Sequence, residues 1–182
     1  MAGMAQAGAA VSRVWGPLSR TGVGAALAAG LADQASKLWL LYDFDLERRV
    51  RATLTPFIDL VLVWNTGISY GLLQNEGRLG LWGLLIFKGA AVVFLWIWLA
   101  RCSSKLTAVA LGFIIGGAIG NAVDRLHWPG VMDFMLFHIR TDGWSFQWYV
   151  FNLADAAIVA GVVGLLYDSM RVGTPQKRPD PG

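Results

Sequence analysis

Four long apolar stretches constrain this chain more than any other feature of its sequence. They cover residues 22–42, 80–100, 106–124 and 151–167. A helix needs about 20 mostly apolar residues to cross the hydrocarbon core of a bilayer. Inside that core every backbone polar group must be satisfied within the segment, which a helix achieves. We therefore predict a mainly α-helical membrane protein with four transmembrane helices.

The composition agrees with this prediction. Of the 182 residues, 55% are hydrophobic and 15% are charged, and the mean hydropathy is +0.51. A soluble domain of this size carries more charged residues. The net charge of +3 is small and the basic residues are scattered, so no nucleic-acid partner is indicated. We expect membrane lipids around a single integral-membrane domain, 1–182, whose ends, 1–12 and 172–182, are disordered.

Four crossings place both termini on the same side of the membrane. The connection 101–105 is short and basic, and such loops stay in the cytoplasm. We therefore expect cytoplasmic termini in a multi-pass protein. The two long connections, 43–79 and 125–150, then lie on the outer side.

The long outer connections are rich in strand-forming residues. Residues 55–73 hold β-branched and aromatic side chains around an Asn-Thr-Gly sequence at 65–67, which predicts strands with a turn there. Residues 131–150 hold similar side chains around Asp142-Gly143, a pair that suits a tight hairpin turn. Open sheet edges are not tolerated in hydrocarbon. The sequence thus predicts a small β-cradle and a β-hairpin on the outer membrane surface.

Two acidic residues lie at the outer ends of the last two apolar stretches. Asp124 ends one stretch and Asp155 begins the next, and each follows an asparagine, Asn121 or Asn152, by three residues. An acid is costly inside a bilayer and usually marks a function there. Two carboxylates held close together share a proton, so one can accept a proton while the other donates one. We therefore predict Asp124 and Asp155 as a catalytic pair.

Small residues predict that the last two helices approach each other closely. A stripe of them runs along each helix, and such stripes let membrane helices pack with their backbones near each other. The stripes consist of Gly112, Gly116 and Gly120 in the third helix, and of Ala154, Ala157, Gly161 and Gly164 in the fourth.

Other polar residues are candidates for substrate binding or for support of the two acids. Asp33 and Lys37 lie four residues apart on one helix face, where they can form an ion pair. Arg125 could tune Asp124, hold a phosphate-like headgroup or extend to the interface. Asp133 lies in the expected hairpin, where we expect it to make structural hydrogen bonds. The remaining candidates are Asn65, which could bind an extended backbone, Asn121 and Asn152.

Motifs of other catalytic classes are absent from the sequence. It contains two histidines, no His-Glu-x-x-His motif and a single cysteine, so no metal site is indicated. The Gly-x-Ser-x-Gly elbow of serine hydrolases is also absent. An enzyme that works with carboxylates remains the favoured interpretation.

Five short motifs occur in order along the chain. They are DQASK at 33–37, NTGISYG at 65–71, GGAIGNAVDRL at 116–126, VMDF at 131–134 and FNLADAAI at 151–158. Together they resemble the bacterial lipoprotein signal peptidases, the signal peptidase II family of intramembrane aspartyl peptidases. Ser69 and Tyr70 stand where that family usually has Ala and Phe.

The resemblance implies an aspartyl endopeptidase of the bacterial inner membrane, with Asp124 and Asp155 as its catalytic dyad. The implied substrates are prolipoproteins whose cysteine carries a diacylglyceryl group, cleaved on the N-terminal side of that cysteine. The resemblance also implies four transmembrane helices with a β-cradle, and neither a metal nor an organic cofactor. We expect the active site toward the outer face and no need for an oligomer.

Two other interpretations stay open. A small transporter could use the same acids as a proton or cation site, because intramembrane acids often mark such pathways. It would need polar residues that lead inward from the acids, whereas 106–115 and 160–166 are almost wholly apolar. A non-catalytic assembly factor would leave the paired acids unexplained.

Overall fold

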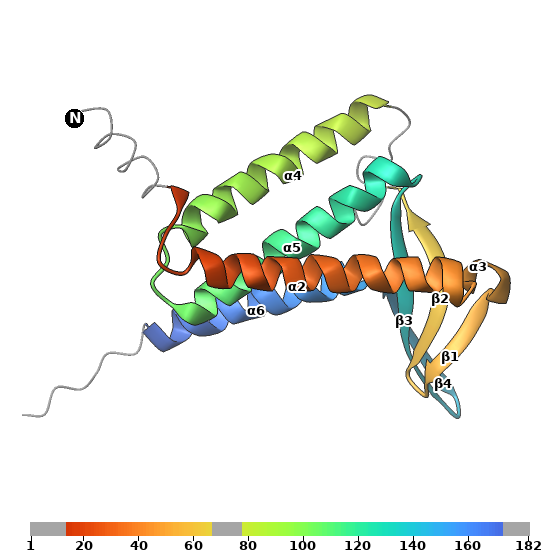
Figure 1. The fold of residues 1–182 in the computed structure, drawn as a ribbon. Coiled ribbons are helices and arrows are strands. Elements are labelled where there is room, and N and C mark those ends of the chain that lie inside the picture. The colour runs from red at the N-terminus through yellow and green to blue at the C-terminus, as the bar shows by residue number, and fades with distance from the viewer. Residues whose placement is uncertain (1–13, 67–77, 173–182) are drawn as a thin grey trace, which may run out of the picture.

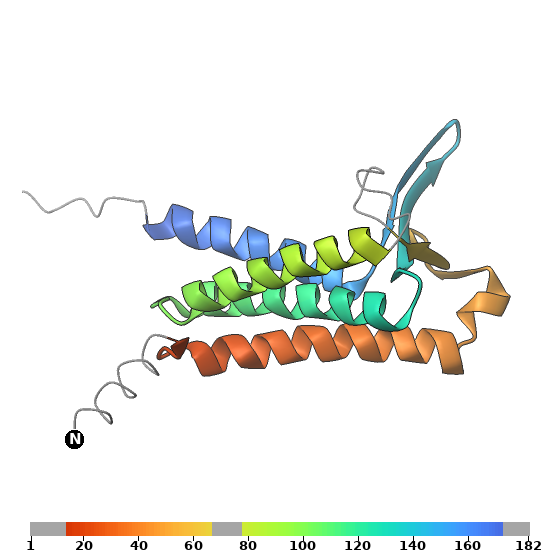
Figure 2. The same cartoon turned by 90° about the horizontal axis from the view of Figure 1, so that it is seen from above.

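The computed structural model describes residues 14–66 and 78–172, which form four long helices and one small sheet (Figure 1). The helices run side by side, and the sheet lies across one end of them in both views (Figures 1 and 2). The ends expected to be disordered fall outside the described residues, except for Val172, which ends the last helix. Positions 67–71 of the NTGISYG motif also fall outside them.

The four helices expected from the apolar stretches are all present, with boundaries that differ by a few residues. The first, α2, continues without a break into a π-helical turn, η1 (Trp39–Asp43). A short helix, α3 (Leu46–Arg49), follows it. The long helices are α2 (Ser19–Leu38), α4 (Arg78–Leu99), α5 (Lys105–His127) and α6 (Leu153–Val172).

Two of the described helices are long and apolar enough to cross a membrane, namely α5 and the Leu153–Arg171 part of α6. A shorter apolar helical stretch, Leu85–Leu99, lies in α4. The crossing of α2 and α4 therefore remains a prediction. Large apolar side chains cover the outside of the helices all the same: Leu31, Phe87 and Leu166 are each at least 60% exposed.

The predicted cradle and hairpin form one antiparallel sheet in the order β1-β2-β3-β4. The strands are β1 (Arg51–Thr55), β2 (Ile58–Asn65), β3 (Val131–Thr141) and β4 (Trp144–Phe151). The two halves join because β2 pairs with β3, which places Asn65 opposite Val131.

One predicted hairpin turn is confirmed, and the sheet contains a further turn that was not predicted. Asp142-Gly143 joins β3 to β4, and Gly143 has φ +101°, a conformation that glycine adopts without strain. The turn between β1 and β2 lies at Pro56-Phe57. Proline has a fixed φ that suits the second residue of a turn and cannot donate a ladder hydrogen bond. β2 therefore runs on to Asn65. The turn expected at 65–67 stays a prediction, because residues 67–73, which would follow it, lie outside the described residues.

An apolar core attaches the sheet to the helices. Leu40 of η1 and Leu46 of α3 pack with Leu60 of β2 and with Met132 and Phe134 of β3. All five are at most 7% exposed. These contacts hold the sheet against the end of the bundle where α5 ends and α6 begins.

The glycine stripe of α5 packs against α2, which differs from the expected packing against α6. A Cβ added at Gly112 would lie 2.3 Å from the carbonyl oxygen of Gly22, and one at Gly116 would lie 2.3 Å from that of Ala26. The close contact of α5 with α6 uses Gly117 instead, where a Cβ would lie 2.4 Å from the oxygen of Ala154. A stripe of small residues shows that one face of a helix allows close approach. It does not show which neighbouring helix packs against that face.

These contacts predict a large difference between two glycine substitutions. Gly116→Ala should lower the free energy of unfolding by about 1–3 kcal/mol, because the new methyl group overpacks the α2–α5 contact. Gly24→Ala on α2 is the matched control, because no atom lies within 4 Å of a Cβ there. Thermal unfolding in detergent measures both. Equal midpoints for the two variants would contradict the close approach of α2 and α5.

Candidate active site

The polar candidates converge where the helices meet the sheet. There the end of α5, the start of α6 and the strand β3 come together (Figure 1). Asp155 and Asn65 are half-buried, while the other candidates are buried. The buried ones are Asp33, Lys37, Asn121, Asp124, Arg125, Asp133 and Asn152.

Lys37 lies between two buried carboxylates. Its Nζ is 2.7 Å from Oδ2 of Asp33 and 2.7 Å from Oδ2 of Asp124. The expected pair of Asp33 and Lys37 therefore exists, and it extends to a second helix. Asp33 also accepts a hydrogen bond at Oδ1 from the backbone N–H of Ala154, at 3.0 Å. It thus satisfies one of the free N–H groups in the first turn of α6, where a negative charge is favoured.

Asp124 is held by donors on three sides. Besides the ammonium group of Lys37, its Oδ1 accepts a hydrogen bond from Nε2 of Gln34 at 2.8 Å. Its Oδ2 accepts one from the backbone N–H of Met132 at 3.1 Å. Both carboxylate oxygens are therefore engaged, and the residue connects α5 with α2 and with β3.

Asp155 lies in the first turn of α6 and is half-buried. Its backbone N–H donates to Oδ1 of Asn152 at 2.9 Å, and the backbone N–H of Asn152 lies 3.4 Å from its Oδ2. This reciprocal arrangement is a capping box, which satisfies the free N–H groups at a helix start. Oδ1 of Asp155 accepts a hydrogen bond from Nδ2 of Asn121 at 2.9 Å.

Asp133 reaches the same place from β3. Its Oδ1 accepts a hydrogen bond from Nδ2 of Asn152 at 2.7 Å, and its Oδ2 accepts one from Nδ2 of Asn65 at 3.1 Å. Burial raises the pKa of Asp133 to about 6; the hydrogen bond from Asn65 opposes this rise, and the nearby charge of Asp155 adds to it. Asp133 thus makes the hydrogen bonds expected of it, and it also holds a proton more strongly than an ordinary aspartate.

Two asparagines connect the carboxylates. Asn152 is a partner of both Asp133 and Asp155, so these two acids lie on either side of one amide-bearing residue. Oδ1 of Asn121 accepts from Nδ2 of Asn152 at 3.1 Å and from Nζ of Lys37 at 3.4 Å. Asp133 and Asp155 therefore share Asn152 as a partner, whereas Asp124 is bound by Lys37.

Arg125 does not extend to the interface. Its side chain is only 8% exposed, and its Nη1 donates to the backbone oxygen of Asn121 at 3.1 Å. Its positive charge lies near the charges of Asp133, Asp124 and Asp155. Arg125 therefore offsets part of the negative charge of the cluster.

Gln34 belongs to the site, although the sequence reasoning did not single it out. Its Nε2 lies within hydrogen-bond distance of Oδ1 of Asp124, of the oxygen of Gly120 and of Oδ2 of Asp33, at 2.8, 3.2 and 3.2 Å. The signal that could have found it is an amide side chain next to an acid in an otherwise apolar helix.

Metal-ligating side chains do not gather in the described part of the chain. Within 14–66 and 78–172, no group of three or more His, Cys, Asp or Glu side chains is placed to hold a metal ion.

The fold combines apolar helices with a carboxylate cluster at their junction with a small sheet. Two solved structures described as a bacterial membrane enzyme have this fold. One superposes with a TM-score of 0.66 at 21% identity and covers 89% of this chain and 94% of its own. The other has a TM-score of 0.63 at 22% identity and covers 83% and 93%.

The chain belongs to the signal peptidase II family. The sequence model described as signal peptidase (SPase) II matches residues 25–171. The lipoprotein signal peptidase of Nitrobacter hamburgensis is 58% identical over 82% of this chain and 92% of its own length. That of Methylorubrum extorquens is 55% identical over 84% and 86%. The family is one of peptidases, and these matches lend no support to the transporter alternative.

The central position of Lys37 predicts a large loss of stability when its charge is removed. Lys37→Met leaves two carboxylates buried without their counter-charge, which should cost about 3–5 kcal/mol of unfolding free energy. Lys105→Met, at an exposed lysine that begins α5, is the control and should change stability by less than about 0.5 kcal/mol. Thermal unfolding in detergent compares the two. A Lys37→Met midpoint no lower than that of the control would exclude the buried ion pair.

Proposed function

We propose that this chain is an aspartyl endopeptidase that removes signal peptides from diacylglyceryl-modified prolipoproteins. It cleaves the bond on the N-terminal side of the lipidated cysteine. Support comes from relatives named lipoprotein signal peptidase, which are 58% and 55% identical. The main support for aspartyl chemistry is that Asp133 and Asp155 share Asn152 as a hydrogen-bond partner.

We assign the reaction to Asp133 and Asp155, which revises the prediction that paired Asp124 with Asp155. Asp155 is half-buried, so a substrate can reach it, and Asp133 keeps a proton up to a pH of about 6. Asp124 is buried, and Lys37, Gln34 and Met132 occupy its oxygens. We therefore propose Asp124 as a positioning residue that holds α2, α5 and β3 in register.

The different environments of the two acids suggest their roles. Asp155 lies at a helix N-terminus, where a negative charge is favoured, so it acts as the base that takes a proton from water. The resulting hydroxide forms a bond to the carbonyl carbon of the scissile peptide. Neutral Asp133 donates a hydrogen bond to the carbonyl oxygen, and a proton from the pair passes to the leaving amine as the C–N bond breaks. The products are a signal peptide with a free carboxylate and a lipidated cysteine with a free amino group.

The neighbouring polar residues hold this pair in place. Asn121 and Asn152 fix Asp155, while Asn65 fixes Asp133 from the end of β2. We propose that the half-buried Asn65 also contacts the extended backbone of the substrate. We propose that no second copy of the chain is required.

We propose that all four long helices cross the bacterial inner membrane. The exposed apolar side chains of α2, α4 and α6 support this arrangement. Residues 14–18 and the end of α6 lie at the end of the bundle opposite the sheet (Figures 1 and 2). With the termini in the cytoplasm, the sheet and the acids lie at the outer face of the membrane. We propose that lipid-modified substrates bind there.

The assignment predicts a specific order among aspartate substitutions. Asp133→Asn and Asp155→Asn should each lower kcat for a diacylglyceryl lipobox peptide by roughly 10²–10⁴-fold, the usual loss when a general acid or base is removed. Asp142→Asn, at an exposed residue of the β3–β4 turn, is the control and should keep full activity. Asp124→Asn should lower the thermal unfolding midpoint together with activity. Two results would restore Asp124 to the catalytic pair. One is full turnover by Asp133→Asn, and the other is lost turnover by Asp124→Asn with an unchanged thermal unfolding midpoint.

The raised pKa of Asp133 predicts the direction of the pH dependence. The proposed reaction needs this acid neutral, so kcat/KM should fall as pH rises through about 6. Asn65→Leu removes a hydrogen bond that stabilises the charged form of Asp133, so the pKa of Asp133 should rise. The alkaline limb of the pH profile, where kcat/KM falls, should then move to higher pH. Thr141→Val, at the far end of β3, should leave the limb unchanged. A limb that moves to lower pH in Asn65→Leu would contradict the role of Asp133 as the acid.

A further inference from the structure

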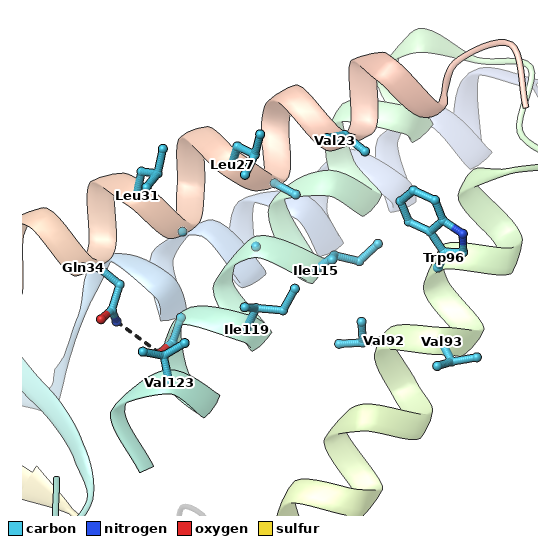
Figure 3. A pocket seen from close by; sticks show the side chains of 14 residues that line it. Val23, Leu27, Leu31, Gln34, Val92, Val93, Trp96, Ile115, Ile119 and Val123 are labelled. Atoms are coloured by element: carbon cyan, nitrogen blue, oxygen red, sulfur yellow. Dashed lines mark hydrogen bonds between the residues drawn. The ribbon is translucent and has the colours of Figure 1, made fainter. Parts of the chain in front are cut away.

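Two hollows of the described bundle differ sharply in their chemistry. One is an apolar groove of about 510 Å³ between α2, α4 and α5, where Gln34 is the polar lining side chain (Figure 3). The other is a pocket of about 550 Å³ formed where α4 ends, α5 begins and α6 ends. This pocket lies at the end of the bundle opposite the sheet (Figures 1 and 2). Its volume is within the range of small-ligand sites.

One positive and one negative side chain line this pocket without forming a pair. Arg101 belongs to the connection after α4, and Asp168 belongs to the last turns of α6. In the part of the chain that the structure describes, Arg101 makes no ion pair and its side chain donates no hydrogen bond. Four hydroxyl-bearing residues also line the pocket, namely Ser103, Ser104, Thr107 and Ser169.

Hydroxyl groups hold the carboxylate of Asp168 in the wall of the pocket. Oγ1 of Thr107 donates a hydrogen bond to its Oδ2, and the side chain of Ser104 is a second partner. Arg171 lies near as well, but its guanidinium lies over the ring of Tyr167, 5.6 Å from the ring centroid. An ionised carboxylate has about four lone-pair sites, so Asp168 can accept hydrogen bonds from a further donor.

One wall of the pocket is apolar and continues along the outside of the helices. Trp98 of α4 and Leu165 of α6 form this wall, and indole rings collect where a membrane meets water. One turn nearer the sheet, Phe94 and Val162 are 66% and 44% exposed. Residues three or four apart share a helix face. A molecule with a charged head and apolar chains therefore finds a matching surface for each part.

We propose that this pocket binds the headgroup of an aminophospholipid, in which a phosphate diester is joined to a primary ammonium group. The phosphate lies at Arg101 and at the hydroxyl groups of Ser103 and Ser169. The ammonium group donates to Asp168, and the acyl chains run along the exposed apolar side chains of α4 and α6. The inference rests on the proposed membrane crossing of these helices, and it does not depend on the peptidase activity.

The two charges of the lining favour a zwitterionic lipid over an anionic one. A guanidinium binds phosphate oxygens through several N–H donors at once. An anionic lipid would place its negative charge beside Asp168 and offer that carboxylate no cation, and like charges at short range are unfavourable. A primary ammonium group carries three N–H donors for Asp168. A trimethylated ammonium group has the same charge and none of these donors.

Position favours a lipid over a soluble phosphate compound. Pockets with basic side chains between transmembrane helices, near the membrane surface, are sites for lipid headgroups. A lipid in the bilayer is confined to the depth of the pocket, which raises its effective concentration there. A soluble compound would leave the apolar wall of Trp98 and Leu165 without a partner.

The test measures thermal unfolding in detergent with added lipids that share their acyl chains. The lipids are phosphatidylethanolamine, phosphatidylcholine and phosphatidylglycerol, and a further sample contains soluble phosphoethanolamine. Arg101→Gln and Asp168→Asn each remove one charge of the pocket. Arg20→Gln, at an exposed arginine near the same end of the bundle and outside the lining, is the control.

A second pair of variants keeps both charges and changes the space in the pocket. Ser169→Trp fills the pocket from α6, at an exposed lining residue. Leu166→Trp, at a residue of α6 that is 60% exposed and outside the lining, is its matched control. Each variant is compared with itself, with and without lipid, so a change in its own stability does not affect the result.

We expect phosphatidylethanolamine, at about ten times its Kd, to raise the unfolding midpoint of the wild type by about 3–6 °C. In Arg101→Gln, Asp168→Asn and Ser169→Trp the rise should fall to the smaller effect of phosphatidylcholine, while both controls keep it. An equal rise with phosphatidylglycerol would show a simple anion site, and one with phosphoethanolamine would show a soluble ligand. An equal rise in every variant would show unspecific lipid contact. Each of these three results overturns the proposal.

Discussion

The buried ion pairs of Lys37 hold together the elements on which the site depends. One ammonium group bridges Asp33 of α2 and Asp124 of α5. Oδ1 of Asp33 also accepts a hydrogen bond from a backbone N–H in the first turn of α6, and Oδ2 of Asp124 accepts one from the backbone N–H of Met132 at the start of β3. Desolvation of buried charges offsets much of their attraction, so the cluster adds little net stability. Its effect is on register, because a shift of any of the four elements would leave a buried charge without its partner.

The four aspartates of the cluster lie in two different environments. Asp33 and Asp124 lie against a lysine, and their oxygens are occupied by protein donors. Asp133 and Asp155 lie on the other side of Asn121 and Asn152, where amides rather than ammonium groups hold them. A lysine is thus the side-chain partner common to one pair, and neutral asparagines are the hydrogen-bond partners of the other. This difference in partners is the basis for the proposed division into a positioning pair and a reactive pair.

The location of this cluster matters as much as its composition. It lies at the end of the helices, where the sheet covers them and where α5 ends and α6 begins. At that point polar backbone groups are free to bond with side chains, and the apolar groove of α2, α4 and α5 ends.

The amino-acid sequence by itself determined the four helices, the Asp142-Gly143 turn and the placement of acids at one end of the bundle. These follow from local apolar length, from turn chemistry and from the direction of successive helices. Tertiary structure decided that the cradle and hairpin are one sheet, that the glycine stripe of α5 faces α2, and that Asn152 binds both Asp133 and Asp155 while Lys37 binds Asp124. Each of these depends on contacts between residues far apart in the chain, and the spacing of residues along one segment carries no information about which distant segment it meets.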